Sequence, residues 1–177
     1  MCQTVAGKSL PMEKFAVAKA DRFLAQGNEL VLPALELIYV WNGFKILGKS
    51  WEMMEPVFLL VEKCLKDIEL KKGIMLQLFV NMIFLFDVHV INSEIIDFSE
   101  TRQFYLEDFA LCTLLRGMCL KYMNLPLQAE DCYLTVIGHK GSLKRDTYLV
   151  PYAMYERALI LKDKDIAEAM DLLEKAK

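Results

Sequence analysis

Residues 110–141 read ALCTLLRGMCLKYMNLPLQAEDCYLTVIGHKG, and this stretch decides the fold. Its first half carries an apolar stripe at helical spacing, formed by Leu111, Leu114, Leu115, Met118 and Tyr122. The first helix is expected to end near Asn124, and Pro126 opens a second, because proline is tolerated in a first helical turn. The inner face of this second helix carries Ala129, Cys132, Tyr133 and Val136. The stretch therefore predicts two helices joined by a short turn.

This pair follows the tetratricopeptide pattern, in which small residues allow two helices to approach and larger residues fill the groove beside them. Gly117 falls at the small position of the first helix, Ala129 at that of the second, and Tyr133 at the second helix's aromatic position. Thr113 stands where the pattern has tryptophan, so the match is degenerate. A later pair repeats the theme, and an earlier one is expected around Tyr39–Gly43. The predicted repeat-packing residues are Gly43, Gly117, Ala129, Tyr133, Ala158 and Ala169.

Helical signals also dominate the rest of the chain. Apolar periodicity predicts helices from Pro11 to about Phe23, from Pro33 to about Leu47 and from Glu52 to about Lys66. Two more are expected from Pro151 to about Leu161 and from Ile166 onward. The last pattern reaches Lys177 without a stop signal, as expected of a fragment or a truncated product. The predicted class is all-α, a short α-solenoid of degenerate helix pairs.

Composition limits the functions to consider. The chain has 177 residues, 55% of them apolar and 25% charged, which excludes a disordered chain. A net charge of −3 argues against nucleic-acid binding, which needs a strongly basic face. The N-terminus has no signal-peptide pattern, and the five cysteines are scattered without metal-ligand spacing. Reduced thiols in the cytoplasm, with no metal and no cofactor, are therefore predicted.

The segment Ile74–Ile91 is unusual because it is nearly all apolar. Its length raises the question of a membrane span, but four polar side chains lie inside it, among them Asp87 and His89. We predict a buried helix, with a strand as the alternative. Peripheral contact of this segment with a membrane or lipid droplet is a further functional alternative.

A nucleotide-binding motif competes with the repeat interpretation. Gly43–Ser50, GFKILGKS, satisfies G-x-x-x-x-G-K-[ST], and Asp87 follows an apolar run as a metal-binding aspartate does. Bulky residues fill the inner positions of the loop, although a phosphate-binding loop needs left-handed backbone there. The residues before Gly43 also fit a helix better than a strand. A small P-loop protein using Lys49, Ser50 and Asp87 is thus the alternative to a non-enzymatic module.

Several strings resemble a particular family. TVAGKSLPMEKF at 4–15, PALELIYVWNG at 33–43, LRGMCLKY at 115–122, PLQAE at 126–130 and YAMYE at 152–156 are similar to the C-terminal part of the tetratricopeptide-repeat protein 39 family. The resemblance covers roughly residues 4–65 and 102–177. It implies an all-helical, non-catalytic protein-interaction scaffold or adaptor, linked to lipid homeostasis and binding an unidentified protein partner. It offers no catalytic residues.

We divide the chain accordingly into three parts. Residues 1–66 hold the N-terminal helices with one degenerate pair, and residues 67–104 hold the atypical apolar segment and a connector. Residues 105–177 hold two tetratricopeptide-like pairs. A peptide clamp is not predicted, because Asn42 and Arg116 lie one place away from the position that such clamps use.

Overall fold

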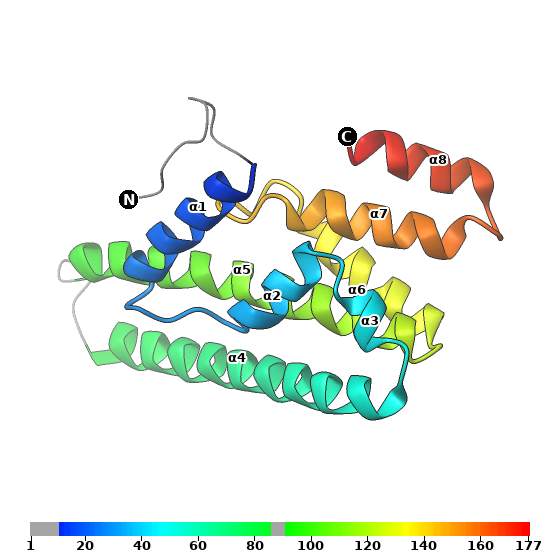
Figure 1. Cartoon of the computed structure of the whole chain (residues 1–177). Helices are drawn as coiled ribbons and strands as arrows, with labels where there is room; N and C mark the ends of the chain where they lie inside the picture. The colour runs from blue at the N-terminus through cyan, green and yellow to red at the C-terminus, as the bar shows by residue number, and fades with distance from the viewer. Residues whose placement is uncertain (1–10, 86–90) are drawn as a thin grey trace. The chain divides into compact units, whose positions relative to one another are not determined.

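The computed structural model describes residues 11–85 and 91–177, and its side chains at residues 13–74, 76, 77 and 104–177. The chain divides into two compact units, Met1–Val31 and Leu32–Lys177. Every regular element of the described residues is an α-helix, in the order that Figure 1 labels. The all-α class is therefore confirmed.

The first unit holds one described helix, α1 (Pro11–Ala25). It begins at the proline that the sequence marks as a first-turn residue. It ends before Gly27 and Asn28, which both have positive φ, of 70° and 65°. These residue types adopt a left-handed backbone with the least strain, so they stop the helix.

The prediction of one helix from Pro33 to Leu47 is wrong, because Asn42 interrupts it. Helix α2 spans Pro33–Val40 and helix α3 spans Phe44–Leu47. Between them Asn42 has a φ of 59°, and the N–H of Gly43 donates to Ile38 O at 2.7 Å. The N–H of Asn42 donates to Tyr39 O at 2.8 Å, which completes a Schellman motif with asparagine in place of glycine. The carbonyls at the end of α2 are thereby satisfied.

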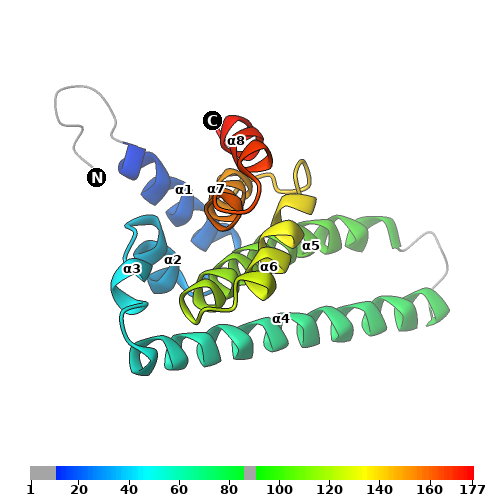
Figure 2. The same ribbon diagram turned by 90° about the vertical axis from the view of Figure 1, so that its right-hand side faces the viewer.

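Two long helices follow, α4 (Trp51–Leu85) and α5 (Ile91–Tyr122), and they lie side by side in both views (Figures 1 and 2). The predicted helix from Glu52 to Lys66 is correct in type but too short. The helix continues beyond Lys66 because no glycine–proline or asparagine–glycine turn signal follows. Gly73 is a single glycine, which the interior of a helix tolerates. The proposed division points at residues 66 and 104 both lie within these helices.

The segment Ile74–Ile91 is helical as far as its residues are described, which are 74–85 and Ile91. Its predicted burial is wrong at the first positions, because Ile74 is 54% exposed and Leu76 61% exposed. Asp87 and His89 lie outside the described residues. No helix in the described part of the chain is both long and apolar enough to cross a membrane. Contact of this segment with a lipid surface stays a prediction.

Helix α5 is the centre of the second unit, since it packs against α2, α4, α6 and α7. Its C-terminal half is buried on almost every side, which is why its apolar residues do not form a single stripe. The core also takes Phe44 from α3, Met54 and Val61 from α4, and Tyr133 from α6. The largest buried apolar side chains of α5 are Leu111, Leu114, Leu115 and Leu120.

Helices α6 (Pro126–Gly138), α7 (Leu149–Leu161) and α8 (Ile166–Lys175) follow as a stack, in which α6 packs on α5, α7 on α6 and α8 on α7. Arg157 on α7 connects its neighbours, with nitrogens 3.1 Å from Glu130 Oε1 on α6 and 2.7 Å from Glu168 Oε1 on α8. The Asp165 side chain caps α8 by accepting the N–H of Glu168 at 2.9 Å. This succession of adjacent helix pairs confirms the tetratricopeptide-like array.

Candidate functional site

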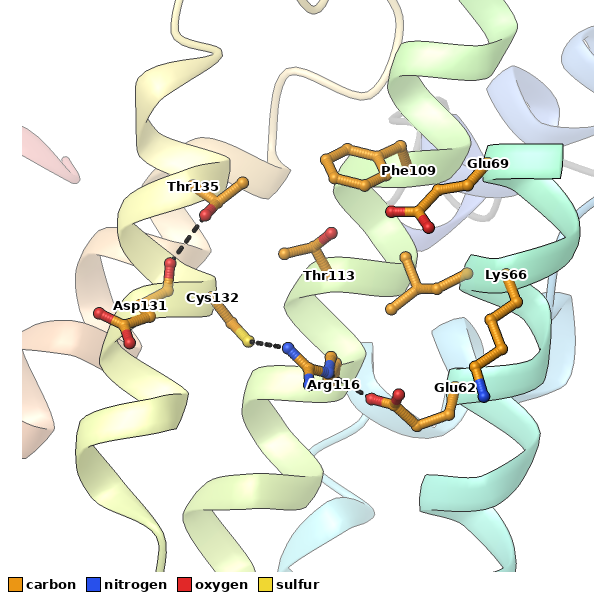
Figure 3. Close-up of a pocket in the computed structure, with 10 residues that line it drawn as sticks. Glu62, Lys66, Glu69, Phe109, Thr113, Arg116, Asp131, Cys132 and Thr135 are labelled. Atoms are coloured by element: carbon orange, nitrogen blue, oxygen red, sulfur yellow. Dashed lines mark hydrogen bonds and ion pairs between the residues drawn. The ribbon is translucent and has the colours of Figure 1, made fainter. Parts of the chain in front are cut away.

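A groove of about 340 Å³ lies between α4, α5 and α6 (Figure 3). Helix α5 provides its floor, and α4 and α6 provide its two walls. The groove is open to solvent along one side. Its lining residues are Glu62, Leu65, Lys66, Glu69, Phe109, Thr113, Arg116, Asp131, Cys132 and Thr135.

Arg116 joins the floor of the groove to both walls. Its Nε pairs with Glu62 Oε1 on α4, and its Nη1 donates to Cys132 Sγ on α6 at 3.7 Å. Arginine keeps its charge at any pH that a protein survives, so Arg116 is a permanent cation at this point. The contacts of Arg116 therefore fix one end of the groove in a definite shape.

Thr113 gives the groove a buried hydroxyl that has no hydrogen-bond partner. The residue is only 6% exposed, and its Oγ1 makes no hydrogen bond to any of the described residues. A buried hydroxyl without a partner costs the fold about 1–3 kcal/mol. The oxygen has almost no accessible surface, so a ligand in the groove could bond to it only after neighbouring side chains move.

The repeat pattern explains why the space is open. In the pattern W-x-x-L-G, Thr113 occupies the tryptophan position and Arg116 the leucine position, immediately before Gly117. A threonine is far smaller than an indole and leaves volume unfilled, while arginine introduces charge where leucine would pack. Two of the residues that line the groove, Thr113 and Arg116, are therefore departures from the repeat pattern.

The walls carry charges of both signs. Acidic side chains come from Glu62, Glu69 and Asp131, and the basic ones from Lys66 and Arg116. Leu65 and Phe109 supply apolar surface between them. Mixed polar and apolar walls around a hydroxyl suit a peptide, which presents backbone donors and acceptors together with side chains.

None of the predicted packing residues lines the groove, and all but the half-buried Gly43 are buried. A Cβ added to Gly117 would lie 2.6 Å from Tyr133 Cε1 and 3.1 Å from Cys132 Cβ, so α5 and α6 approach each other closely there. Ala129, Ala158 and Ala169 are all buried. Gly43 lies in the turn after α2, where an added Cβ would meet Ile38 of that same helix. The six residues therefore form no common site.

None of the groove residues was predicted as a site residue, although Thr113, Arg116 and Cys132 were named for their places in the repeat pattern. The departure from the repeat pattern at Thr113 could have identified them. A small side chain where the pattern has tryptophan predicts an unfilled space beside the helix. Arg116 carried the second signal, a charge at an apolar position. Glu62 and Glu69 have no sequence signal of their own, since exposed acidic residues are common on helices.

The segment Gly43–Ser50 does not have the geometry of a phosphate-binding loop. Its two glycines both have right-handed backbone, with φ of −71° and −72°. The N–H groups of Ile46, Leu47 and Gly48 donate to carbonyls of the same segment and cannot receive a phosphate. Helix α2 precedes it, where a P-loop requires a strand. Gly48 has a packing role, since a Cβ there would lie 2.2 Å from Cδ1 of Tyr122.

Replacing Lys49 with alanine should change neither nucleotide binding nor stability. Lys49 is exposed in the turn before α4, so its removal should alter the free energy of unfolding by less than about 0.5 kcal/mol. We expect no saturable heat on titrating either protein with Mg-ATP, and equal melting temperatures. Saturable binding that Lys49→Ala abolishes would contradict this geometry.

The comparisons with known proteins agree with the fold. The profile of the family described as Iml2/Tetratricopeptide repeat protein 39 matches residues 1–123. The chain is also 32% identical over 174 residues to the Caenorhabditis elegans protein named tetratricopeptide repeat protein ttc-39B. That alignment covers 98% of this chain and 24% of the relative, so the chain spans about a quarter of that protein's length. No solved structure matches the chain significantly.

The family profile covers well over half of the chain, and the helix pair at α5 and α6 has the close contact that the repeat pattern requires. The resemblance seen in the sequence is therefore confirmed. This chain belongs to the Iml2/Tetratricopeptide repeat protein 39 family.

Proposed function

We propose that this chain is a non-enzymatic protein-interaction module, and that the groove between α4, α5 and α6 receives an extended peptide segment of its partner. The observation that carries the proposal is the open groove between three helices, whose walls offer charges of both signs and apolar surface above the buried hydroxyl of Thr113. Family membership supports it, since helix-pair arrays present extended surfaces to other proteins. The groove has room for a few residues of a peptide, consistent with a local anchor within a larger interface.

The proposal extends to the cellular role. We propose a scaffold or adaptor of the cytoplasm, linked to lipid homeostasis as the family resemblance implies. No disulfide joins the four described cysteines, which is consistent with a reducing compartment. Recognition of the partner would then depend on hydrogen bonding in the groove and not on a cofactor.

Replacing Thr113 tests the groove directly. Valine has the same shape without the hydroxyl, so Thr113→Val should stabilise the free chain by about 1 kcal/mol and weaken peptide binding about 2- to 10-fold. Tryptophan restores the residue of the repeat pattern and fills the groove, so Thr113→Trp should abolish binding. The probe is a set of linear peptides selected from a random displayed library against the intact chain, then measured by fluorescence anisotropy.

Leu134→Trp is the matched control for this experiment. Leu134 is exposed on α6, as Thr135 is, but it does not line the groove. The control should bind the selected peptides with the affinity of the unaltered chain. If peptides bind Thr113→Trp as tightly as they bind the unaltered chain, the groove is not the binding site. If the library yields no binding peptide, the chain does not recognise linear peptides.

A further inference from the structure

Two thiols from different helices face each other beside the groove. Cys64 on α4 and Cys112 on α5 have sulfur atoms 3.6 Å apart, and the thiol of Cys112 donates to Cys64 Sγ. A disulfide bond is about 2.05 Å long, so both residues are reduced. They are 48 positions apart in sequence, and only the packing of α4 on α5 brings them together.

The two thiols differ in access to solvent. Cys64 is partly exposed, whereas Cys112 is fully buried behind it. A small oxidant in solution would therefore meet Cys64 first. Cys119 and Cys132 are also buried, so Cys64 is the most accessible of the four cysteines that the structure describes.

The surroundings also favour ionisation of Cys64 over that of Cys119 and Cys132. The hydrogen bond from Cys112 lowers the pKa of Cys64, and Lys71 lowers it further, against the opposing effects of burial, Asp108 and Asp67. Burial raises the pKa of Cys119 to about 12 and also raises that of Cys132, which Arg116 partly offsets. The thiolate is the reactive form of cysteine, so access and ionisation select the same residue.

We propose that Cys64 and Cys112 form a peroxide-reactive dithiol, in which Cys64 is the attacking thiol and Cys112 the resolving one. The Cys64 thiolate attacks one oxygen of hydrogen peroxide, the O–O bond breaks, and Cys64 becomes a sulfenic acid, while the departing hydroxide takes up the proton that the thiol released and leaves as one water. The Cys112 sulfur then attacks the Cys64 sulfur and displaces its hydroxyl as a second water. The two thiols lose two electrons and two protons, and one peroxide becomes two waters.

The product would be a disulfide that joins α4 to α5. These helices are the wall and the floor of the groove, and Leu65 and Thr113 immediately follow the two cysteines in sequence. The cross-link would fix the spacing of the two helices at that point. Transient disulfides of this kind occur in reducing compartments as redox-sensing devices.

The test is mass spectrometry of the full chain in a Cys2→Ser background, because Cys2 lies outside the described residues. The protein is treated with hydrogen peroxide, its remaining thiols are blocked with iodoacetamide, and it is digested without reductant. We expect a cross-linked peptide pair containing Cys64 and Cys112, lighter by two hydrogens than the two free peptides. Dithiothreitol should remove it.

Two variants assign the roles of the two thiols. In Cys112→Ser the sulfenic acid on Cys64 cannot be resolved, so dimedone should label Cys64 more than in the parent protein. In Cys64→Ser the buried Cys112 should stay unlabelled. Cys119→Ser is the matched control and should form the cross-link at the parental rate.

Two results would overturn the proposal. One is the absence of a cross-linked pair in the parent protein while its circular dichroism spectrum remains helical. The other is dimedone labelling of Cys112, Cys119 or Cys132 before Cys64. Both results are measured on the parent protein. The proposal can therefore be disproved even if a serine variant fails to fold.

Discussion

Replacing Phe44 with alanine should lower the free energy of unfolding by about 3–5 kcal/mol, because it leaves a cavity in the core. Phe44 is completely buried on the four-residue helix α3, and its ring packs edge to face with Tyr39, with the ring centroids 6.1 Å apart. An aromatic pair of this geometry adds about 0.5–1.5 kcal/mol beyond burial alone. Urea denaturation followed by circular dichroism measures the loss.

Ile46→Ala is the matched control for Phe44→Ala. Ile46 lies on the same short helix, but it is 62% exposed, so its replacement should change stability by less than about 0.5 kcal/mol. The two variants together distinguish a packed helix from a nucleotide loop. In a phosphate-binding loop, residues between the two glycines surround the ligand and need not pack into a core. Equal stability of the two variants would argue against the packing of α3 described above.

Sequence reasoning succeeded where local signals and tertiary packing agree. The stretch 110–141 predicted a helix pair, and α5 ends at Tyr122 with α6 beginning at Pro126. Asn124 has a φ of 61°, and the N–H of Leu125 donates to Leu120 O, as in the turn at Asn42. At Asn124 a proline two residues later made the stop visible in the sequence. At Asn42 no proline followed, and the Asn42–Gly43 turn signal was interpreted as the small position of a continuous helix, so the break was missed.

Sequence reasoning failed where an apolar pattern does not report burial. Ile74 and Leu76 suggested a buried segment, yet they lie exposed on a helix that extends well past its predicted end. Hydrophobic periodicity shows which face of a helix is apolar, but it does not show whether another element covers that face. The covering element depends on the rest of the array, which local patterns cannot supply.

The groove was missed for a different reason. A motif match directs attention to the residues that fit, such as Gly117 and Tyr133, whereas the groove follows from the residues that do not fit. Thr113 was noted only as a weakness of the match, although it lines the space between three helices. The polar character of the walls required coordinates, because Glu62 and Asp131 come from helices on either side of α5.

Replacing Gly117 with alanine should destabilise the chain by about 1–3 kcal/mol, although alanine is the better helix former. The added Cβ would lie 2.6 Å from Cε1 of the fully buried Tyr133 ring. The Tyr133 hydroxyl also donates to Met118 Sδ at 3.4 Å, which holds the ring in place. Overpacking at this contact should outweigh the gain of about 1 kcal/mol in helix propensity. Thermal and urea denaturation measure the net effect.

Gly73→Ala should have the opposite effect on the stability of the same protein. Gly73 is also inside a long helix, but nothing lies within 4 Å of the position that its Cβ would take. Only helix propensity then acts, so Gly73→Ala should stabilise the chain by up to about 1 kcal/mol. If the two glycine-to-alanine substitutions change the free energy of unfolding in opposite directions, then the close contact between α5 and α6 requires the glycine at position 117. The backbone conformation does not.

A double-mutant cycle identifies the contact itself. Tyr133→Leu removes the ring carbon that the new Cβ would strike, so Gly117→Ala should be neutral or stabilising in that background. The coupling energy between the two sites should then be about 1–3 kcal/mol, in the range of residues in direct contact. Additive effects would mean that Gly117 does not pack on Tyr133. The repeat pattern alone predicts that Gly117 and Tyr133 pack together. If the effects of the two substitutions on stability were additive, the contact that defines α5 and α6 as a tetratricopeptide unit would contribute no energy.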